Sequence, residues 1–372
     1  MSTTTANQLI YSIALTLLPG IGHVNARKLI AHTGSPEALF QEKKSALKKI
    51  DRIGDYVANS VANAKEYLER AEQEISFIEK NGIKARFFTD EGFPSRLNQC
   101  ADGPILIYTK GTADLNSQYI VSMVGTRRAT DYGKEMCKML IDGLSALNIM
   151  IVSGLAYGID TAAHKYALDY SLPTVGVLAH GLDRIYPPAN HQLAERMLEK
   201  GGLVTEFMSK NDPDRENFPM RNRIIAGLAD ATIVVEAGSK GGALITADIA
   251  NSYNRDVFAV PGKVSDAYSE GCNNLIKTNR AALLQKAEDI FYIMGWDKNP
   301  IKKEPIQQKL FVQLEPDEEL IVEYLQKNGE CSIDSLCLDT SLSTGKVATA
   351  LLNLECVGLI KSLPGKIYKM AR

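Results

Sequence analysis

The sequence predicts an α/β protein built around a doubly wound, mostly parallel sheet, with a small helical region before it and a winged helix after it. Six apolar runs between residues 119 and 260 are rich in β-branched side chains and alternate with helical patterns. Strands that helices cover on both faces have this uniform hydrophobicity. At 372 residues the chain is also too long for one ordinary core, so two or three domains are expected.

Residues 1–82 have the pattern of several short helices. Ile10, Ile13 and Leu17 share one helix face, and the glycine-rich turn at 19–22 separates that helix from the next. The turn resembles that of a helix-hairpin-helix motif, whose backbone amides contact DNA phosphates. The simpler interpretation is a turn inside a small helical bundle, and the sequence leaves both open.

Residues 83–296 are predicted to form the sheet domain. The runs that we expect to be its strands span residues 119–124, 149–152, 174–178, 202–205, 232–235 and 257–260. A parallel sheet of this kind binds its ligands beyond the carboxyl ends of its strands. The loops that follow these runs are therefore the first place to look for a site.

The C-terminal part begins with a polar stretch, residues 297–317, whose prolines and lysines predict a linker. Residues 318–372 have the pattern of three helices followed by two short strands, which is typical of a winged helix. From residue 301 to the end there are nine basic and ten acidic residues. This balance argues against the segment as the main DNA-binding surface and is compatible with a protein-docking module.

The composition sets limits on location and partners. The net charge of −2 gives no overall attraction to nucleic acid, so any phosphate site must be a local patch. The six cysteines form no CxxC pair, which favours reduced thiols in the cytoplasm over a zinc site. We expect no signal peptide, because the N-terminus lacks a basic region followed by an apolar core and a cleavage site. We also expect no membrane span, because no apolar run reaches about 18 residues.

The stretch from Phe218 to Leu228 is the most informative motif. It places an aromatic ring and two arginines, Arg221 and Arg223, near the start of a predicted helix. Guanidinium groups match phosphate oxygens, and the first turn of a helix adds unpaired N–H groups. A phenylalanine offers a flat surface on which a base can stack. Together these features indicate a polynucleotide strand rather than a small metabolite.

Other loops place glycine where a predicted strand ends. Gly125 and Arg127 follow the first strand, Gly154 the second, and Lys240 and Gly241 the fifth. Glycine lets backbone amides approach a phosphate closely. Each feature alone also suits a tight turn or an arginine that pairs with a carboxylate. Because these loops are expected at one edge of the sheet, together they predict a shared phosphate pocket.

No constellation predicts catalysis, a metal site or a cofactor site. Ser153 has no histidine and aspartate in a triad-like pattern, and His164 suits a structural helix position better than a general base. His180, Asp183 and Tyr186 are candidates for a pocket wall. Neither a GxGxxG fingerprint nor a GxxxxGK[ST] loop occurs. We therefore expect no enzyme activity, no metal and no cofactor.

Six motifs resemble those of the DNA-processing protein A family, also called DprA or Smf. They span residues 153–164, 181–188, 218–228, 236–247, 257–262 and 271–276. Their order runs through the whole central domain, which makes the resemblance specific. The flanking regions also fit the family architecture, which is a sterile-alpha-motif-like domain, an extended Rossmann domain and a winged-helix domain.

The resemblance implies a bacterial, cytoplasmic, homodimeric protein without catalytic activity. Such proteins bind single-stranded DNA, protect incoming strands during natural transformation and load the RecA recombinase on them. The family's DNA pocket carries over to Gly125, Arg127, Ser153, Gly154, Phe218, Arg221, Arg223 and Lys240, and we expect Asn222 and Gly241 to belong to the same site. Phosphate contacts and base stacking predict binding that is independent of sequence.

One loop departs from the family pattern. Members often carry a serine pair after the position of Ala237, where Gly241 and Ala243 stand in this chain. The loop therefore relies on backbone amides and on Lys240. Two rival interpretations stay open. One is a Rossmann-fold nucleotide-processing enzyme with Glu236 as acid or nucleophile, and the other is an interaction scaffold with weak DNA affinity.

Overall fold

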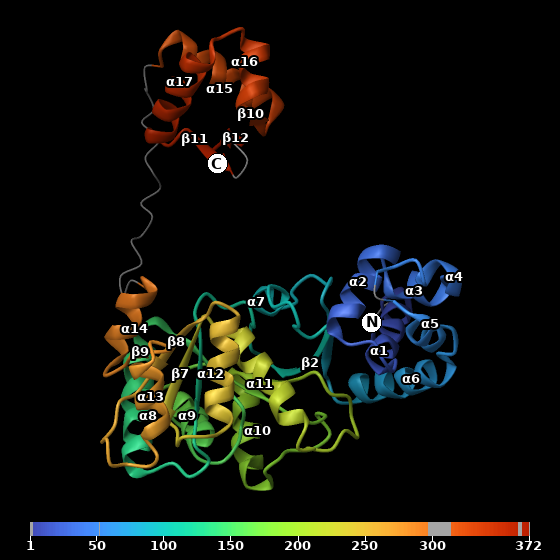
Figure 1. Ribbon diagram of the computed structural model, residues 1–372, viewed down its shortest axis with the longest axis vertical. Coiled ribbons are helices and arrows are strands. Elements are labelled where there is room, and N and C mark those ends of the chain that lie inside the picture. The colour runs from blue at the N-terminus through green and yellow to red at the C-terminus, as the bar shows by residue number, and fades with distance from the viewer. Residues whose placement is uncertain (1–2, 52, 297–313, 364–366, 372) are drawn as a thin grey trace. The chain divides into compact units, whose positions relative to one another are not determined.

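The computed structural model describes residues 3–51, 53–296, 314–363 and 367–371 (Figure 1). The chain divides into two compact units, residues 1–298 and residues 299–372. The predicted linker, 297–317, lies mostly outside the described residues. Among the helices that the structure describes, none is both long and apolar enough to cross a membrane.

A nine-stranded sheet forms the centre of the first unit. Its strands are β1 (Lys84–Phe87), β2 (Leu106–Gly111), β3 (Ile120–Gly125), β4 (Met150–Ser153), β5 (Thr174–Val177), β6 (Gly202–Thr205), β7 (Ala231–Glu236), β8 (Asp256–Ala259) and β9 (Ala282–Leu283). Their order is β1-β2-β6-β5-β4-β3-β7-β8-β9. In the run β6-β5-β4-β3-β7-β8-β9, each strand is parallel to its neighbours. At the other edge, β1 is antiparallel to β2, and β2 is antiparallel to β6.

The direction of strand order reverses beside β3. The chain places β4, β5 and β6 successively on one side of β3, and then returns to place β7, β8 and β9 on the other. The connections that leave β3 and β7 therefore diverge at their carboxyl ends. A doubly wound sheet opens its ligand crevice at such a point.

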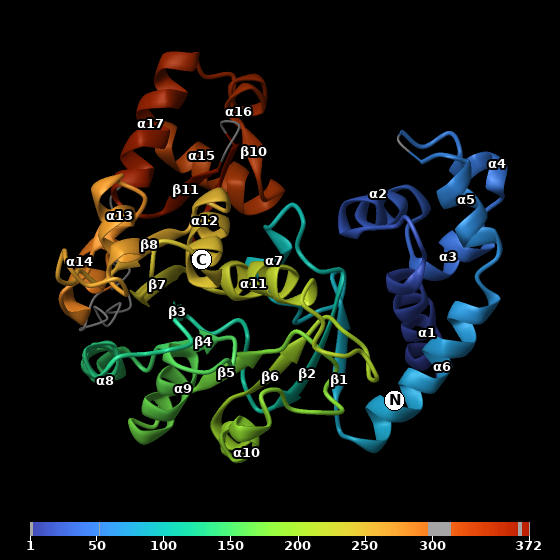
Figure 2. The same ribbon diagram turned by 60° about the horizontal axis from the view of Figure 1, so that its bottom comes forward.

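Helices cover both faces of the sheet, and buried apolar strands make this necessary. One face carries α8 (Asp131–Leu144), α9 (Ile159–Asp169), α10 (His191–Lys200) and α14 (Ala287–Met294), and the other carries α11 (Asn217–Leu228), α12 (Gly242–Ser252) and α13 (Glu270–Lys277). Figure 2 shows α11 and α12 on the side opposite to α9 and α10. The short helices η1 (Ser145–Leu147), η2 (Pro188–Asn190) and α7 (Ser95–Asn98) complete the layers.

The N-terminal helices pack at the β1 edge of the sheet (Figure 2). They are α1 (Thr3–Leu17), α2 (His23–Thr33), α3 (Pro36–Gln41), α4 (Lys44–Leu47), α5 (Asp55–Ala62) and α6 (Lys65–Lys80). Gly20, at φ +78°, turns the chain between α1 and α2. Their apolar core continues into Phe87, Tyr108 and Met208. The helices and the sheet edge are therefore joined by shared packing.

The sequence-based strands are confirmed, each to within about a residue or two. The prediction missed β1, β2 and β9. Two of these lie at the sheet edges, where β1 carries Lys84 and Arg86, and β9 spans only Ala282 and Leu283. Edge strands need less continuous apolar sequence, because a covering helix is not required on both faces.

The second unit confirms the predicted winged helix. It contains α15 (Pro316–Asn328), α16 (Ile333–Thr340) and α17 (Thr344–Cys356), and the strands β10 (Cys331–Ser332), β11 (Ile360–Leu363) and β12 (Ile367–Met370) in the order β10-β12-β11. Its core contains Ile321, Leu336 and Leu354, all buried. Ser332 caps α16 by accepting a hydrogen bond from the Ser335 amide at 3.2 Å.

Candidate functional site

A cavity of about 340 Å³ opens at the carboxyl ends of β3 and β7, where the strand order reverses. Seven of the ten predicted site residues line it, namely Gly125, Arg127, Phe218, Arg221, Asn222, Lys240 and Gly241. A second pocket of about 100 Å³ adjoins it, because Arg127, Phe218 and Arg221 line both. Gly154 lines this smaller pocket.

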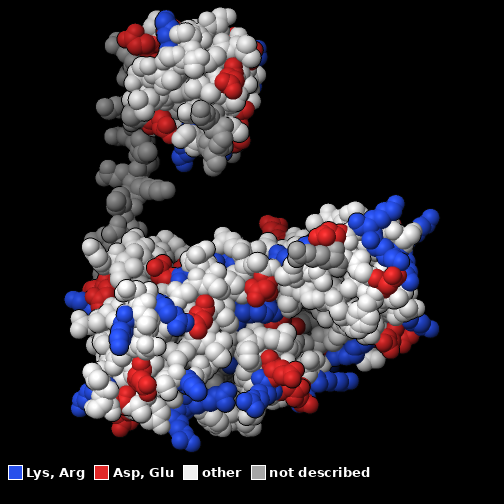
Figure 3. All heavy atoms as spheres, in the orientation of Figure 1, with Lys and Arg blue, Asp and Glu red and all other residues white. Residues whose placement is uncertain are grey.

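Arg127 and Lys240 are the exposed cations of the cavity. Within the described part of the chain, neither forms an ion pair with a carboxylate. Figure 3 shows both signs of charge interspersed over the visible face of the protein, in keeping with the net charge of −2. At the cavity itself, positive charge comes from these two exposed side chains and from the buried Arg221.

Phe218 lies half-buried between the two pockets, near the start of α11. The guanidinium carbon of Arg127 lies 5.3 Å from its ring centroid, and that of Arg221 lies 5.9 Å away. Tyr186 meets the same ring edge-on, at a centroid distance of 6.2 Å. These contacts restrict the ring to one orientation at the cavity wall.

Arg221 lies beneath the cavity and is only 4% exposed. Its Nη1 donates to the carbonyl oxygens of Gly154 and of Val177, the latter at 2.6 Å. Burial is the main cause that lowers the pKa of Arg221 to about 10; Asp160 opposes this fall, and Arg127 contributes to it. Even so the side chain stays charged at neutral pH. Arg221 therefore anchors two strand ends and supplies positive potential from below.

Asp160 is the carboxylate that faces Arg221. Its Oδ2 accepts hydrogen bonds from the amides of Gly154 at 3.2 Å and Ala156 at 3.3 Å, which fixes the loop between β4 and α9. Burial raises the pKa of Asp160, against the effect of Arg221. Gly154 has no room for a side chain, because a Cβ there would lie 2.3 Å from Arg221 Nη1. Close packing on the arginine thus requires this glycine.

Gly241 precedes the first turn of α12 at φ +156°, and no side chain caps that helix. No atom lies within 4 Å of the position that its Cβ would occupy. The backbone at this point faces open space, and Asn222 lies beside it, with Nδ2 3.4 Å from the carbonyl oxygen of Gly242. An anion in the cavity would meet the positive end of α12 here.

Arg223 and Ser153 do not line either pocket. Arg223 forms an ion pair with Glu206, donates to the carbonyl oxygen of Asp102 at 2.5 Å and lies 2.9 Å from His23 Nε2. The hydroxyl of Ser153 is fully buried and donates to the carbonyl oxygen of Met123 at 2.6 Å. Residues two apart on a helix point to different faces, which is why Arg221 and Arg223 separate.

The residues considered for catalysis are held in structural contacts. His164 is fully buried, its Nδ1 lies 2.7 Å from the Thr174 hydroxyl, and burial lowers its pKa to about 3. Glu236 is 1% exposed, accepts hydrogen bonds from the amide (3.0 Å) and the hydroxyl of Thr130, and does not line the cavity. Both side chains serve the packing of helices α8 and α9 against the sheet.

His180 and Tyr186 line the smaller pocket, whereas Asp183 pairs with Arg184 outside it. Burial lowers the pKa of His180, so the ring is neutral at pH 7. Tyr157, which the sequence reasoning did not single out, also lines this pocket and is 49% exposed. Its signal was present, since it stands in the same glycine-bounded loop as Gly154.

Comparison with protein families and relatives identifies this arrangement. The family model described as DNA recombination-mediator protein A matches residues 84–295, and that of the DprA winged helix domain matches residues 309–366. Protein Smf of Synechocystis is 31% identical over 397 residues, which covers 96% of this chain and 98% of the relative. DNA processing protein DprA of Streptococcus pneumoniae is 40% identical over 201 residues, or 54% of this chain and 71% of the relative.

Solved structures give the same result. DNA processing protein A from Streptococcus pneumoniae aligns with a TM-score of 0.64 at 32% identity, covering 76% of this chain and 97% of the other. The Helicobacter pylori protein, studied for its single-stranded DNA binding mode, aligns with a TM-score of 0.52 at 27% identity, covering 57% and 95%. The chain therefore belongs to the DNA recombination-mediator protein A family.

Proposed function

We propose that this protein binds single-stranded DNA without sequence preference, protects incoming strands during natural transformation and loads RecA on them, acting as a cytoplasmic homodimer. In this proposal Arg127 and Lys240 neutralise phosphates, and Phe218 stacks on a base. The amides near Gly241 and the positive end of α12 hold phosphate oxygens. Gly125, Asn222 and the buried Arg221 complete the cavity.

The observation that carries the proposal is the position of Phe218 between two cations, at the wall of the cavity. The cations can bind phosphate groups, and the flat apolar ring beside them can stack on an unpaired base. In a duplex the bases stack on one another, so no base face is accessible to the ring. Membership of the family and the single-stranded DNA binding of the Helicobacter pylori relative support the same choice.

The contacts of the four predicted cations support a smaller salt dependence than four phosphate contacts would give. Arg223 is engaged by Glu206, and Arg221 is buried among backbone carbonyls, so their counterions are not released to a strand. Within the described residues, Arg127 and Lys240 are the cavity cations that are exposed and pair with no carboxylate. With these two contacts the log–log salt slope for a single strand should be about −1.4. Direct contacts from all four cations would give a slope near −3.

Binding of a fluorescent oligo-dT across a salt series tests the proposal, with a duplex of equal length as the comparison. We expect tight, salt-sensitive binding of the single strand alone, and its loss in an Arg127→Ala/Lys240→Ala double variant. Equal affinity for the duplex, or an unchanged affinity in the double variant, would contradict the proposed site. Assembly of RecA on a single strand, with and without the protein, tests the loading step separately.

The nucleotide-processing alternative depends on Glu236 as acid or nucleophile. That carboxylate is committed to Thr130 at the start of α8 and lies outside the cavity, which favours a binding protein over an enzyme. Incubation with mononucleotides should accordingly release no free base. The scaffold alternative predicts variants that lose DNA affinity yet still stimulate RecA.

A further inference from the structure

The N-terminal helices hold the segment that carries the candidate site. This segment, residues 206–223, runs from the end of β6 into the first half of α11 and includes Phe218 and Arg221. At its two ends, Glu206 and Arg223 meet His23 of α2, with His23 Nε2 3.1 Å from Glu206 Oε2 and 2.9 Å from Arg223 Nη2. Helix α2 thus contacts both ends of the segment at one point.

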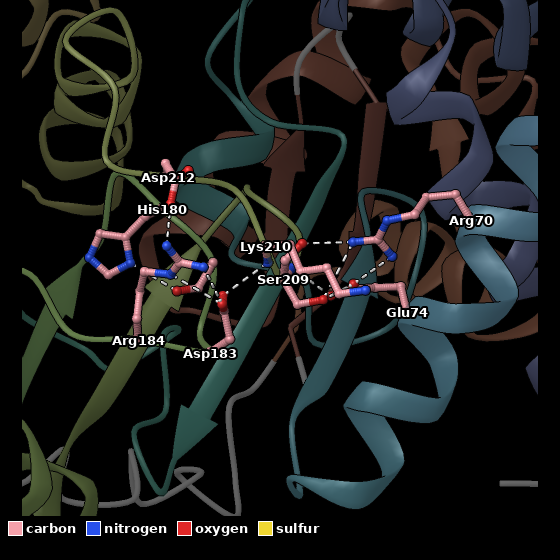
Figure 4. A network of polar contacts seen from close by, with 9 residues as sticks. Arg70, Glu74, His180, Asp183, Arg184, Ser209, Lys210 and Asp212 are labelled. Atoms are coloured by element: carbon pink, nitrogen blue, oxygen red, sulfur yellow. Dashed lines mark hydrogen bonds and ion pairs between the residues drawn. The ribbon is translucent and has the colours of Figure 1, made fainter.

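Helix α6 holds the segment near its beginning, at Ser209 (Figure 4). Glu74 Oε1 accepts from the Ser209 amide at 2.9 Å, and Oε2 accepts from the Ser209 hydroxyl at 2.5 Å. Arg70 donates to the Ser209 carbonyl oxygen at 2.7 Å and to Glu74 at 3.0 Å. Two residues one helical turn apart therefore satisfy every polar group of Ser209.

Glu74 is 1% exposed, and Met208, next to Ser209, belongs to the apolar core of the N-terminal helices. A buried carboxylate is costly unless hydrogen bonds and an opposite charge compensate it. Both are supplied across the contact between α6 and the segment. The buried Glu74 carboxylate is therefore compensated only when Ser209 occupies this position. This requirement fixes the position of Ser209 relative to α6.

The residues that follow Ser209 also contact the loop 180–186, which forms another wall of the smaller pocket. The amide of Lys210 donates to Asp183 Oδ1 at 3.1 Å, and the amide of Gly181 donates to the Asn211 carbonyl oxygen at 3.3 Å. Arg184 also pairs with Asp212, as Figure 4 shows. Residues 180–186 therefore rest on residues 209–212, and they end at Tyr186, whose ring touches Phe218.

We propose that Glu74 is a positioning residue of the single-strand site, because its contact with Ser209 sets the placement of Phe218 and Tyr186. This inference rests on the proposed function. The N-terminal helices then tune affinity through a residue that lines neither pocket. Glu74→Gln keeps the volume of the side chain but removes its charge. In either orientation its amide N–H group faces a partner that can only donate, the Ser209 amide or the Arg70 guanidinium, so the contact is weakened without opening a cavity.

The test is a double-mutant cycle with Phe218→Ala, read as affinity for oligo-dT. Glu74→Gln should weaken binding roughly 2- to 30-fold, the range for coupled positions. It should leave the salt slope unchanged, and it should add less than about twofold when Phe218→Ala is already present. Equal effects in both backgrounds, or none in either, would overturn the inference. No binding by the wild-type protein would instead remove the proposed function itself.

A matched control and a DNA-free measurement separate positioning from general destabilisation. Asn98→Ala removes another bond to the N-terminal helices, from Arg27 Nη1 at 2.7 Å, which does not involve the segment. It should leave affinity unchanged. In hydrogen exchange without DNA, Glu74→Gln should speed exchange in residues 206–217 and 180–187, and Asn98→Ala should not. Faster exchange confined to α6 would contradict the role of Glu74.

Discussion

The guanidinium of Arg127 lies over the ring of Phe218, 5.3 Å from its centroid, at the wall where the two pockets meet. A cation and an aromatic ring that touch each other attract the two parts of a nucleotide, its phosphate and its base. The contact favours the arginine conformation that lies against the ring, although the side chain stays exposed. Charge and stacking are therefore separable in variants that remove one partner at a time.

Phe218→Ala should weaken binding of a single strand by about 1–3 kcal/mol, the usual contribution of one stacked base. The salt slope should stay the same, since no phosphate contact is lost. Titrations of oligo-dT at several salt concentrations measure both quantities. Phe218→Trp is the control and should retain affinity, because it keeps a flat aromatic surface. A slope that changes with the ring would contradict the assignment.

Arg127→Ala should reduce the magnitude of the salt slope by about 0.7, the share of one phosphate contact on a single strand. Lys240→Ala should do the same, and the two effects should add because the residues lie on different loops. The same titrations give the answer. Exposed Arg128, which does not line the cavity, is the matched control, and Arg128→Ala should leave the slope unchanged.

The two arginines of α11 illustrate how far the sequence could lead. The topological rule correctly indicated where the loops after β3 and β7 converge, because it depends only on strand order. The shared motif predicts one site for Arg221 and Arg223, although residues two apart on a helix point to different sides, and only Arg221 lines the cavity. The sequence motif, taken as a unit, hid this difference. Their partners, Val177 and Glu206, are set by tertiary packing.

Arg223→Ala should lower the free energy of unfolding, by at most about 3–5 kcal/mol, because it leaves the Glu206 carboxylate, 5% exposed on its side chain, with only His23 beside it. The salt slope of the remaining folded protein should not change. Urea unfolding measures the first quantity, and DNA titration measures the second. Arg215, exposed in the same segment, is the control, and Arg215→Ala should be neutral within about 0.5 kcal/mol. A salt slope of smaller magnitude for Arg223→Ala would show instead that Arg223 contacts a phosphate.

Long-range contacts were beyond the reach of sequence patterns for a physical reason. The contact of Glu74 with Ser209 joins residues 135 positions apart, and neither belongs to a motif. Periodicity reports which face of an element is buried, but not which element covers it. The strand β1 escaped for a similar reason, because Lys84 and Arg86 interrupt its apolar pattern at the sheet edge. The location of the site at the strand ends was predictable because it depends on strand order. Contacts between particular side chains, such as Glu74 with Ser209, were not.

His164 should make stability depend on pH below neutrality. Burial lowers its pKa to about 3, whereas the unfolded chain takes up the proton near pH 6.5. Between those values the unfolded state binds one more proton, so the free energy of unfolding falls as pH falls, by at most about 1.4 kcal/mol per unit. Above about pH 6.5 the ring is neutral in both the folded and the unfolded state, so His164 no longer lowers the free energy of unfolding. Urea unfolding between pH 4.5 and 7.5 measures it.

His164→Gln should flatten that profile relative to the wild-type protein, whatever its stability at pH 7. Carboxylates titrate alike in both proteins, so the difference between the two profiles isolates the histidine. His191, 62% exposed on its side chain, is the control, and His191→Gln should give a profile parallel to that of the wild-type protein. Parallel profiles for His164→Gln would show that the ring is not buried in its neutral form.

Gly133 and Gly345 should respond in opposite directions to the same substitution. Both lie in the first turn of a helix, α8 and α17 respectively. A Cβ on Gly133 would lie 2.3 Å from Glu236 Oε2, whereas none of the neighbouring atoms comes within 4 Å at Gly345. In open space, alanine stabilises a helix by roughly 0.5–1 kcal/mol relative to glycine.

Gly345→Ala should therefore raise the free energy of unfolding of the winged-helix unit by that amount. Gly133→Ala should lower that of the first unit, because the methyl group must displace a buried carboxylate that caps α8 through Thr130. Thermal unfolding followed by calorimetry resolves the two units if they melt separately. An additional Glu236→Gln change should not rescue Gly133→Ala, since the amide has the same volume, whereas Glu236→Ala should relieve the clash. Failure of Glu236→Ala to do so would place the strain elsewhere in α8.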